Sequence, residues 1–312
     1  MYKYIFGPVP SRRLGISLGI DLLQEKICTL NCVYCECGST KVLTTDRHEF
    51  VPTKEVLEEL KDFLSQYEYP DYITFSGSGE PTLHSGIGEI ISFLKEEYPK
   101  IPVAVLTNGT LLSDAQVRNE LMGADLVIPS IDSANESSFL KINRPQKDLS
   151  LEKYIQGLVD FSEEFDGEIW LEVFILPDYN DSDEDLEALE EVIRRISPGR
   201  VQLNTMDRPG AVAGLRKATH QDLRRIIERW DIENAEIISN FVKREELRSY
   251  NKNKEEAILE TVSRRPCTLD DLVHVTGLHK NEVNKYLDVL EESGSIMPVM
   301  QERGIFYQKS KE

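Results

Sequence analysis

The stretch KICTLNCVYCECGST, residues 26–40, contains four of the five cysteines of the chain. Cys28, Cys32 and Cys35 are spaced C-x3-C-x2-C, and Cys37 follows two residues later. A disulfide framework would distribute its cysteines along the chain, whereas clustered cysteines in an intracellular protein indicate metal or redox chemistry. Three thiolates on one loop can hold one face of a 4Fe-4S cluster and leave its fourth iron without a protein ligand. The spacing therefore predicts a metal centre with an open coordination position.

From residue 16 onward, short apolar runs alternate with segments of helical periodicity. Six strand-helix units are predicted, with strands near residues 16–23, 72–77, 103–109, 126–132, 168–176 and 200–206 and helices near residues 52–67, 85–97, 113–122, 150–165, 182–196 and 219–230. Apolar strands separated by helices indicate a parallel sheet covered by helices. Six units are too few for a closed eight-stranded barrel, so an open doubly wound sheet and a partial barrel both fit.

Residues 252–312 follow a different pattern. Three short helices are predicted near residues 253–265, 268–277 and 279–294, and two strands near residues 295–300 and 304–308. Three helices followed by a hairpin indicate a winged-helix domain. We expect an α/β domain over residues 1–245 and this small domain over residues 252–312. The charged residues 243–256 form either the connection or one exposed helix.

The formal net charge of the chain is -19, and residues 252–312 contribute only -2 of it. Such acidity disfavours extensive non-specific binding to nucleic acids. The N-terminal stretch MYKYIFGPVPSRRLG has no apolar region typical of a signal peptide, and no run of residues is long and apolar enough for a membrane span. We expect a cytoplasmic protein that does not contact a membrane.

The cysteine spacing, with the aromatic Tyr34 directly before the third cysteine, resembles the signature of the radical S-adenosylmethionine superfamily. The resemblance covers roughly residues 15–235 and implies a partial (β/α)6 barrel. It implies one 4Fe-4S cluster and S-adenosylmethionine as cofactors, a reductant such as flavodoxin or ferredoxin, and sensitivity to oxygen. In this superfamily the methionine amine and carboxylate chelate the open iron, and an electron cleaves the C5'-sulfur bond to give a 5'-deoxyadenosyl radical.

The stretch SGSGEP, residues 76–81, follows the second predicted strand, where the superfamily has its Gly-Gly-Glu type motif. By this resemblance the backbone at Ser78, Gly79 and Glu80 holds the methionine amino group, while Gly77 and Gly79 permit close approach. Ser78 replaces the first glycine of that motif, which leaves a role of the backbone intact.

Polar residues end the next two predicted strands. By the same resemblance, Asn108 in TNG and Ser130 and Asp132 in SID meet the methionine carboxylate and the ribose hydroxyls, and Tyr34 and the strand end near Leu176 flank adenine.

A narrower resemblance lies in GPVPSRRLGISLGID, residues 7–21, together with SGSGEPTLH, LTNGTLL and SIDS. These stretches are similar to a short branch of radical enzymes related to the tRNA wyosine synthases. Wyosine synthases bind a second cluster through cysteines upstream, whereas this chain has no cysteine before Cys28. The resemblance implies the radical core without the second cluster.

The residues by themselves leave alternatives open. A zinc site would use Cys37, His48 or His84 as the fourth ligand. In the cluster hypothesis Cys37 is an uncoordinated thiol or faces the substrate, because a fourth thiolate would close the open iron. Cys267 is expected to be a small residue packed between helices of the small domain.

Four arginines are candidate substrate contacts or solvated charges: Arg12, Arg13, Arg144 and Arg208. Glu172 and Asn204 lie within apolar strands, where buried polar groups need partners, so we expect them inside the barrel.

The predicted function is reductive cleavage of S-adenosylmethionine to modify a tRNA nucleotide, a protein or peptide side chain, or a metabolite. One alternative is an activase that installs a radical on a partner enzyme. Another is an iron-sulfur or zinc sensor that acts through the winged helix. The predicted recognition helix, residues 279–294, mixes lysines with acidic residues, whereas a base-reading helix usually has a basic face. Contact with protein, or grip on a peptide or tRNA substrate, is therefore favoured over operator binding.

Overall fold

The structure is a computed structural model. It describes residues 2–11, 13–23, 25–67, 69–206, 210–238, 252–264, 266–301 and 304–310. Their main body is an eight-stranded sheet of order β1-β2-β5-β6-β7-β8-β9-β10. The strands are β1 (Ile5–Ser11), β2 (Gly15–Ile20), β5 (Tyr72–Phe75), β6 (Val103–Thr107), β7 (Leu126–Pro129), β8 (Glu168–Phe174), β9 (Arg200–Asn204) and β10 (Ala235–Ile237). Neighbouring strands pair in parallel from β2 to β10, and β1 pairs antiparallel with β2.

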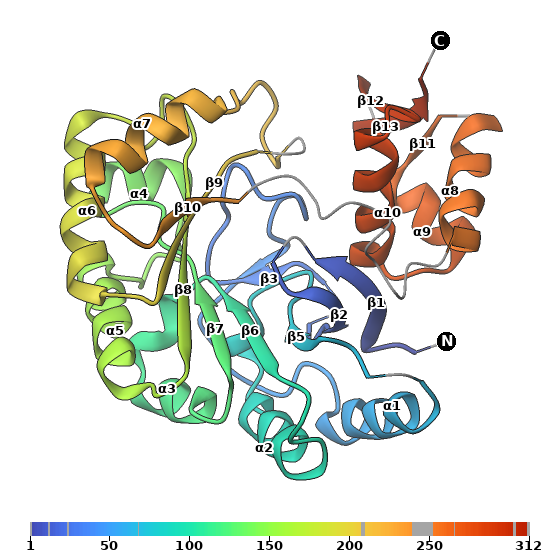
Figure 1. The fold of residues 1–312 in the computed structure, drawn as a ribbon, viewed down its shortest axis with the longest axis horizontal. Coiled ribbons are helices and arrows are strands. Elements are labelled where there is room, and N and C mark those ends of the chain that lie inside the picture. The colour runs from blue at the N-terminus through green and yellow to red at the C-terminus, as the bar shows by residue number, and fades with distance from the viewer. Residues whose placement is uncertain are drawn as a thin grey trace.

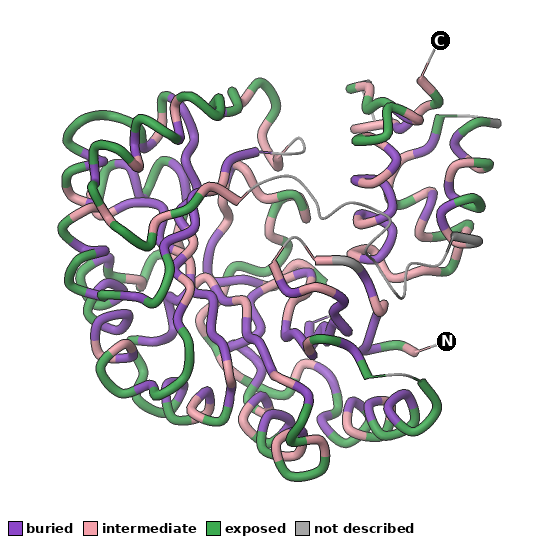
Figure 2. Tube along the Cα trace, viewed as in Figure 1, coloured by how far each residue is buried: buried purple, intermediate pink, exposed green. Residues whose placement is uncertain are grey.

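Helices cover the outer face of the curved sheet, and the inner face is turned toward the cysteine loop (Figure 1). They are α1 (Thr53–Gln66), α2 (Ile87–Glu97), α3 (Ala115–Leu121), α4 (Glu136–Ile142), α5 (Leu151–Glu164), α6 (Asp183–Ile196) and α7 (His220–Trp230). Figure 2 shows buried residues along the strands and on the helix faces that meet them, with exposed residues outside. The prediction of a partial barrel of six strand-helix units is confirmed.

Several short elements were not predicted. Edge strand β1 contains Gly7, Pro8 and Pro10, which disfavour a strand in sequence patterns, and proline is tolerated at a sheet edge. Strand β10 and the small pair β3 (Ile27–Cys28) and β4 (Val42–Leu43) are too short for periodicity to reveal. The 3-10 helices η1 (Pro81–Leu83) and η2 (Thr110–Ser113) follow the SGSGEP and TNG loops.

The hairpin between β1 and β2 fills the barrel interior at the amino-terminal ends of the strands. Its Leu14 is buried with side chains from β6 and β7, namely Ala104, Leu126 and Ile128. The hairpin therefore closes the end of the barrel opposite the cysteine loop.

The C-terminal part contains α8 (Lys252–Arg264), α9 (Leu269–Thr276) and α10 (Lys280–Glu292). A sheet of order β11-β13-β12 is formed by β11 (Cys267–Thr268), β12 (Ile296–Gln301) and β13 (Gly304–Lys309). These elements bury an apolar cluster of their own, and Cys267 belongs to it, as predicted. The three predicted helices and both strands are present, and β11 adds a third strand.

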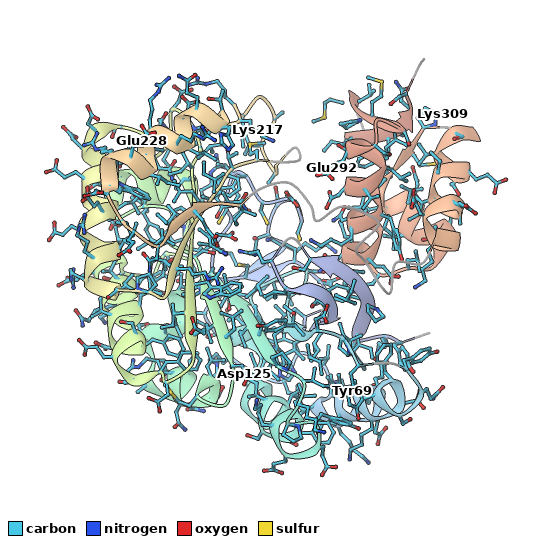
Figure 3. The ribbon with its side chains drawn as sticks, in the orientation of Figure 1. Tyr69, Asp125, Lys217, Glu228, Glu292 and Lys309 are labelled. Carbon is cyan, nitrogen blue, oxygen red and sulfur yellow. The ribbon has the colours of Figure 1, made fainter. Side chains whose placement is uncertain are left out.

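Helix α10 lies on the side of the C-terminal part that faces the barrel and contacts β1 (Figure 1). Most of the predicted connection, residues 243–256, lies outside the described residues, and so does the predicted boundary at residue 245. Charged side chains, among them Glu228 on α7 and Lys309 on β13, project from the outer surface (Figure 3). None of the described helices has the length and apolarity that crossing a membrane requires.

Candidate functional site

A cavity of about 240 Å³ lies at the carboxyl ends of the parallel strands. The cysteine loop forms one wall, and the ends of β5, β6, β7 and β8 form the others. The predicted site residues that line it are Cys28, Cys32, Tyr34, Cys35, Gly77, Gly79, Glu80, Asn108 and Ser130. Residues as far apart in the sequence as Cys28 and Ser130 thus surround one space. The cavity is also lined by Arg13, Lys26, Cys37 and Glu172.

Each of the three predicted ligand thiols faces an N–H donor from another residue. Asn108 Nδ2 lies 3.4 Å from the sulfur of Cys28, and Asn143 Nδ2 lies 3.4 Å from the sulfur of Cys32. Lys26 Nζ lies 2.6 Å from the sulfur of Cys35. Donors aimed at sulfur stabilise thiolates, the form that binds iron. The arrangement therefore fits an iron-sulfur cluster.

The cysteine environments are not equivalent. Burial raises the pKa of Cys28 to about 11 and raises that of Cys32. A hydrogen bond from Cys37 and the charge of Lys26 lower the pKa of Cys35 to about 5, although burial opposes this. The hydrogen bond from Cys37, together with the positive charge of Lys26, makes Cys35 the thiol with the lowest pKa of the three.

The SGSGEP loop packs directly on the cysteine loop. A Cβ at Gly79 would lie 2.0 Å from the carbonyl oxygen of Ile27, and the amide of Glu80 donates to that oxygen at 3.0 Å. A Cβ at Gly77 would lie 2.3 Å from Oδ1 of Asp21. Both glycines are therefore required by close contacts between loops.

Glu80 joins this loop to the end of β6. Its buried carboxylate accepts hydrogen bonds from Thr107 Oγ1 at 2.6 Å, from the Asn108 amide at 2.7 Å and from both the amide and the hydroxyl of Thr82. Burial raises the pKa of Glu80, and these hydrogen bonds oppose the shift. The carboxylate thus holds the TNG loop, in which Asn108 reaches Cys28, against the SGSGEP loop.

Asp132 follows β7 and is engaged by groups of the protein. Its buried carboxylate accepts hydrogen bonds from Tyr34 Oη, from Asn143 Nδ2 at 2.7 Å and from the amide of Phe174 at 3.1 Å, and it does not line the cavity. Burial raises the pKa of Asp132 to about 6. The ring of Tyr34 stacks on Phe174 with centroids 3.8 Å apart. Asp132 therefore orients Tyr34 and Asn143, and its contact with S-adenosylmethionine stays a prediction.

Other predicted residues also lie outside the cavity lining. Ser78 is buried against Asp21, and the side chain of Leu176 is fully buried in an apolar cluster, so the role predicted for this strand end stays a prediction. Arg144 is exposed and does not line the cavity. Both ring nitrogens of His84 are engaged with backbone groups, and neither His84 nor His48 reaches the cysteines' cavity.

Arg13 and Glu172 form the floor of the cavity. Arg13 pairs with Glu172 of β8 and donates to Gln202 of β9 at 3.2 Å. Glu172 therefore lies inside the barrel, as expected, whereas the side chain of Asn204 accepts from the neighbouring Thr205 amide. Arg12 and Arg208 fall outside the described residues.

Three residues that sequence reasoning missed complete the site: Asp21, Lys26 and Asn143. Asp21 directly follows β2, so the expectation of polar groups at strand ends applied to it as well. No local pattern marks Asn143, because only the fold brings α4 beside the cysteine loop.

Within the described part of the chain, no three His, Cys, Asp or Glu side chains converge closely enough to hold a single metal ion. A 4Fe-4S cluster is larger than one ion and spaces its thiolates further apart. The donor set of three thiols around one cavity suits such a cluster.

Comparison with known proteins agrees with this chemistry. The sequence model of the radical SAM superfamily matches residues 26–190. A solved radical SAM methyltransferase from Sphaerobacter thermophilus superposes with a TM-score of 0.55 at 16% identity, covering 71% of this chain and 65% of that one. Fold and match define a radical SAM enzyme, and this class uses a 4Fe-4S cluster and S-adenosylmethionine.

Two curated relatives show to which family within this superfamily the chain belongs. The chain is 38% identical to a protein named GTPase Obg from Brachyspira hyodysenteriae over 94% of its own length, but it spans only 43% of that relative. It is 30% identical to a UPF0026 protein of Methanocaldococcus jannaschii over 98% of this chain and 95% of the relative. The chain belongs to the UPF0026 family within the radical SAM superfamily.

Proposed function

We propose that this protein cleaves S-adenosylmethionine reductively at a 4Fe-4S cluster held by Cys28, Cys32 and Cys35. The observation that carries the proposal is one cavity lined by these three thiols, by the SGSGEP loop and by Asn108. Once bound, the cluster would supply the electron that cleaves the C5'-sulfur bond and yields a 5'-deoxyadenosyl radical. The radical would abstract a hydrogen atom from a substrate at the mouth of the barrel.

The residues of the chain divide the remaining work. Asn108 and Asn143 donate hydrogen bonds to ligand sulfurs, and Lys26 places a positive charge beside Cys35. The SGSGEP backbone would accept hydrogen bonds from the methionine amino group. Ser130 and Glu172 face the same cavity and are candidates for contact with the rest of the cofactor or the substrate. Cys37 lines the cavity and is proposed as a non-ligand thiol.

Kinship and charge favour different substrate classes. Resemblance to the wyosine synthases favours a tRNA nucleotide, whereas the net charge of -19 favours a protein, a peptide or a metabolite. We propose that residues 252–312 form a winged-helix-like domain that helps to hold a macromolecular substrate. We further propose an oxygen-sensitive protein of the cytoplasm that takes electrons from a flavodoxin or ferredoxin.

The alternative of a DNA-binding sensor has less support. The helix that would read bases, α10, contacts β1, its N-cap His279 reaches Asp21 of the barrel, and Glu282, Asn284 and Asp288 along it are buried. An activase remains the alternative enzyme, and it would form 5'-deoxyadenosine efficiently only with its protein partner.

The test uses protein purified without oxygen and reconstituted with iron and sulfide. After reduction with dithionite and addition of S-adenosylmethionine, 5'-deoxyadenosine is quantified beside a Cys32→Ala control. We expect product from the wild type and none from the variant. A fully loaded cluster that gives no product with tRNA, peptides or candidate protein partners would contradict the proposal, and salt-sensitive retention of bulk tRNA would favour the nucleic-acid substrate.

A further inference from the structure

The side chain of His279 connects the C-terminal part to the cofactor site. His279, which caps α10, places its Nε2 3.1 Å from Oδ2 of Asp21, a residue that is 1% exposed at the carboxyl end of β2. The imidazole also stacks on Phe6 of β1, with centroids 4.4 Å apart and planes 8° apart. The contact therefore joins residues 258 positions apart through a hydrogen bond and a ring stack.

The sequence makes room for this contact. A Cβ at Gly19 would lie 2.1 Å from the ring of Phe6, so only glycine lets that ring lie flat over β2. The other face of Phe6 is then available to His279. The backbone of the barrel edge is thus shaped to receive the histidine.

The geometry fixes the tautomer of His279. Its Nδ1 accepts a hydrogen bond from the Asn281 amide at 3.2 Å, which is the capping bond of α10. A neutral imidazole whose Nδ1 accepts must carry its proton on Nε2. Nε2 therefore donates to Asp21 without any need for a charged ring.

Asp21 also accepts hydrogen bonds from the SGSGEP loop. The same Oδ2 accepts hydrogen bonds from the Ser78 amide at 3.1 Å and from the Ser78 hydroxyl at 2.9 Å, and Oδ1 accepts from the Leu23 amide at 3.1 Å. The SGSGEP loop carries the predicted site for the methionine amino group, and Leu23 begins the segment that leads to Cys28. Asp21 thus anchors both walls of the cavity.

We propose that His279 is a positioning residue for S-adenosylmethionine: it holds Asp21 in the rotamer that fixes the backbone at Ser78, so the C-terminal part sets the affinity of the barrel for its cosubstrate. This inference rests on the proposed function for its ligand. It predicts that a macromolecule that displaces α10 from β1 also changes the affinity for S-adenosylmethionine.

Two substitutions separate positioning from capping. In His279→Gln the amide nitrogen takes the place of Nε2, which keeps the donor to Asp21 and loses the cap. In His279→Asn the short side chain keeps the cap, which asparagine provides well, and cannot reach Asp21. His279→Gln therefore removes the helix cap alone, and His279→Asn removes the hydrogen bond to Asp21 alone.

The first readout is amide hydrogen exchange at residues 76–80 of the iron-free full chain. We expect faster exchange in His279→Ala and His279→Asn and wild-type exchange in His279→Gln. The second readout is equilibrium binding of S-adenosylmethionine to the reconstituted protein, with an expected loss of about tenfold in the first two variants at unchanged iron content.

The opposite order, in which Asn behaves as wild type and Gln as Ala, would reduce His279 to a helix cap and overturn the inference. Wild-type exchange and affinity in all three variants would also overturn it. Failure of the proposed function looks different, because the exchange readout needs neither cluster nor cosubstrate: changed exchange in a protein that never binds S-adenosylmethionine would keep the coupling and reject the ligand.

Discussion

The ammonium group of Lys26 lies 2.6 Å from the sulfur of Cys35, and both side chains line the cavity. A fixed positive charge beside a cluster ligand favours the more negative, reduced state of the cluster. Lys26→Met should therefore shift the midpoint potential to a more negative value, which a redox titration followed by electron paramagnetic resonance would measure. Lys41→Met is the matched control, because Lys41 is exposed on the same loop and pairs with Glu25. An equal potential in Lys26→Met and wild type would reject this role.

Cys35 and Cys37 are close neighbours with different expected roles. Cys35→Ala should lose most of its iron after reconstitution, whereas Cys37→Ala should keep about four irons per chain, because three thiolates suffice for the cluster. Iron and sulfide analysis of the two variants decides this. Loss of iron from Cys37→Ala would make Cys37 a ligand and remove the open position.

Gly77 faces Asp21, and a Cβ there would lie 2.3 Å from a carboxylate oxygen. Gly77→Ala should displace the SGSGEP loop and weaken binding of S-adenosylmethionine at least about tenfold. Gly123→Ala is the control, since its Cβ would meet only a methyl group of Ile91, at 3.0 Å. Calorimetric titration of both reconstituted variants measures the effect, and equal affinities would refute the steric argument.

Asp21 should make folding sensitive to acid. Burial by itself would raise its pKa, but hydrogen bonds from His279, the Leu23 amide and Ser78 bring the pKa below its ordinary value. The folded state therefore binds fewer protons here than the unfolded state, so this stabilisation is present above the ordinary aspartate pKa and is lost as the pH falls through the folded value.

The measurement is urea unfolding of the iron-free wild type and of Asp21→Asn at about pH 5 and about pH 3, both below the ordinary pKa of histidine. The difference in free energy of unfolding between the two proteins should shrink at the lower pH. A difference that does not depend on pH would show that Asp21 contributes no linked proton.

Much of the barrel could be predicted from its sequence, because each central strand is apolar along its length and each helix has a clear periodicity. Strands β5 to β9 and the helices between them follow those patterns closely. Edge strand β1 escaped prediction, since its glycine and prolines are compatible with pairing only at an edge. Strand β10 has three residues, too few for any period to be visible.

The candidate site was predictable where chemistry is local and was not where it depends on the fold. The cysteine spacing and SGSGEP indicated two walls of the cavity directly. The hydrogen-bond partners of Asp132 also depend on the fold, because its carboxylate accepts from Tyr34 and Asn143, which lie far from it in the sequence or on another element. His279 reaches Asp21 only through the packing of α10 on β1, which no sequence pattern records.

The central claim is that three cysteines hold a cluster whose remaining iron binds S-adenosylmethionine. Mössbauer spectroscopy of anaerobic protein reconstituted with ⁵⁷Fe, before and after addition of S-adenosylmethionine, tests it most directly. We predict that one iron of the four changes its isomer shift in wild type and in Cys37→Ala alike. Four irons whose spectra do not respond to S-adenosylmethionine in a fully loaded protein would contradict the account.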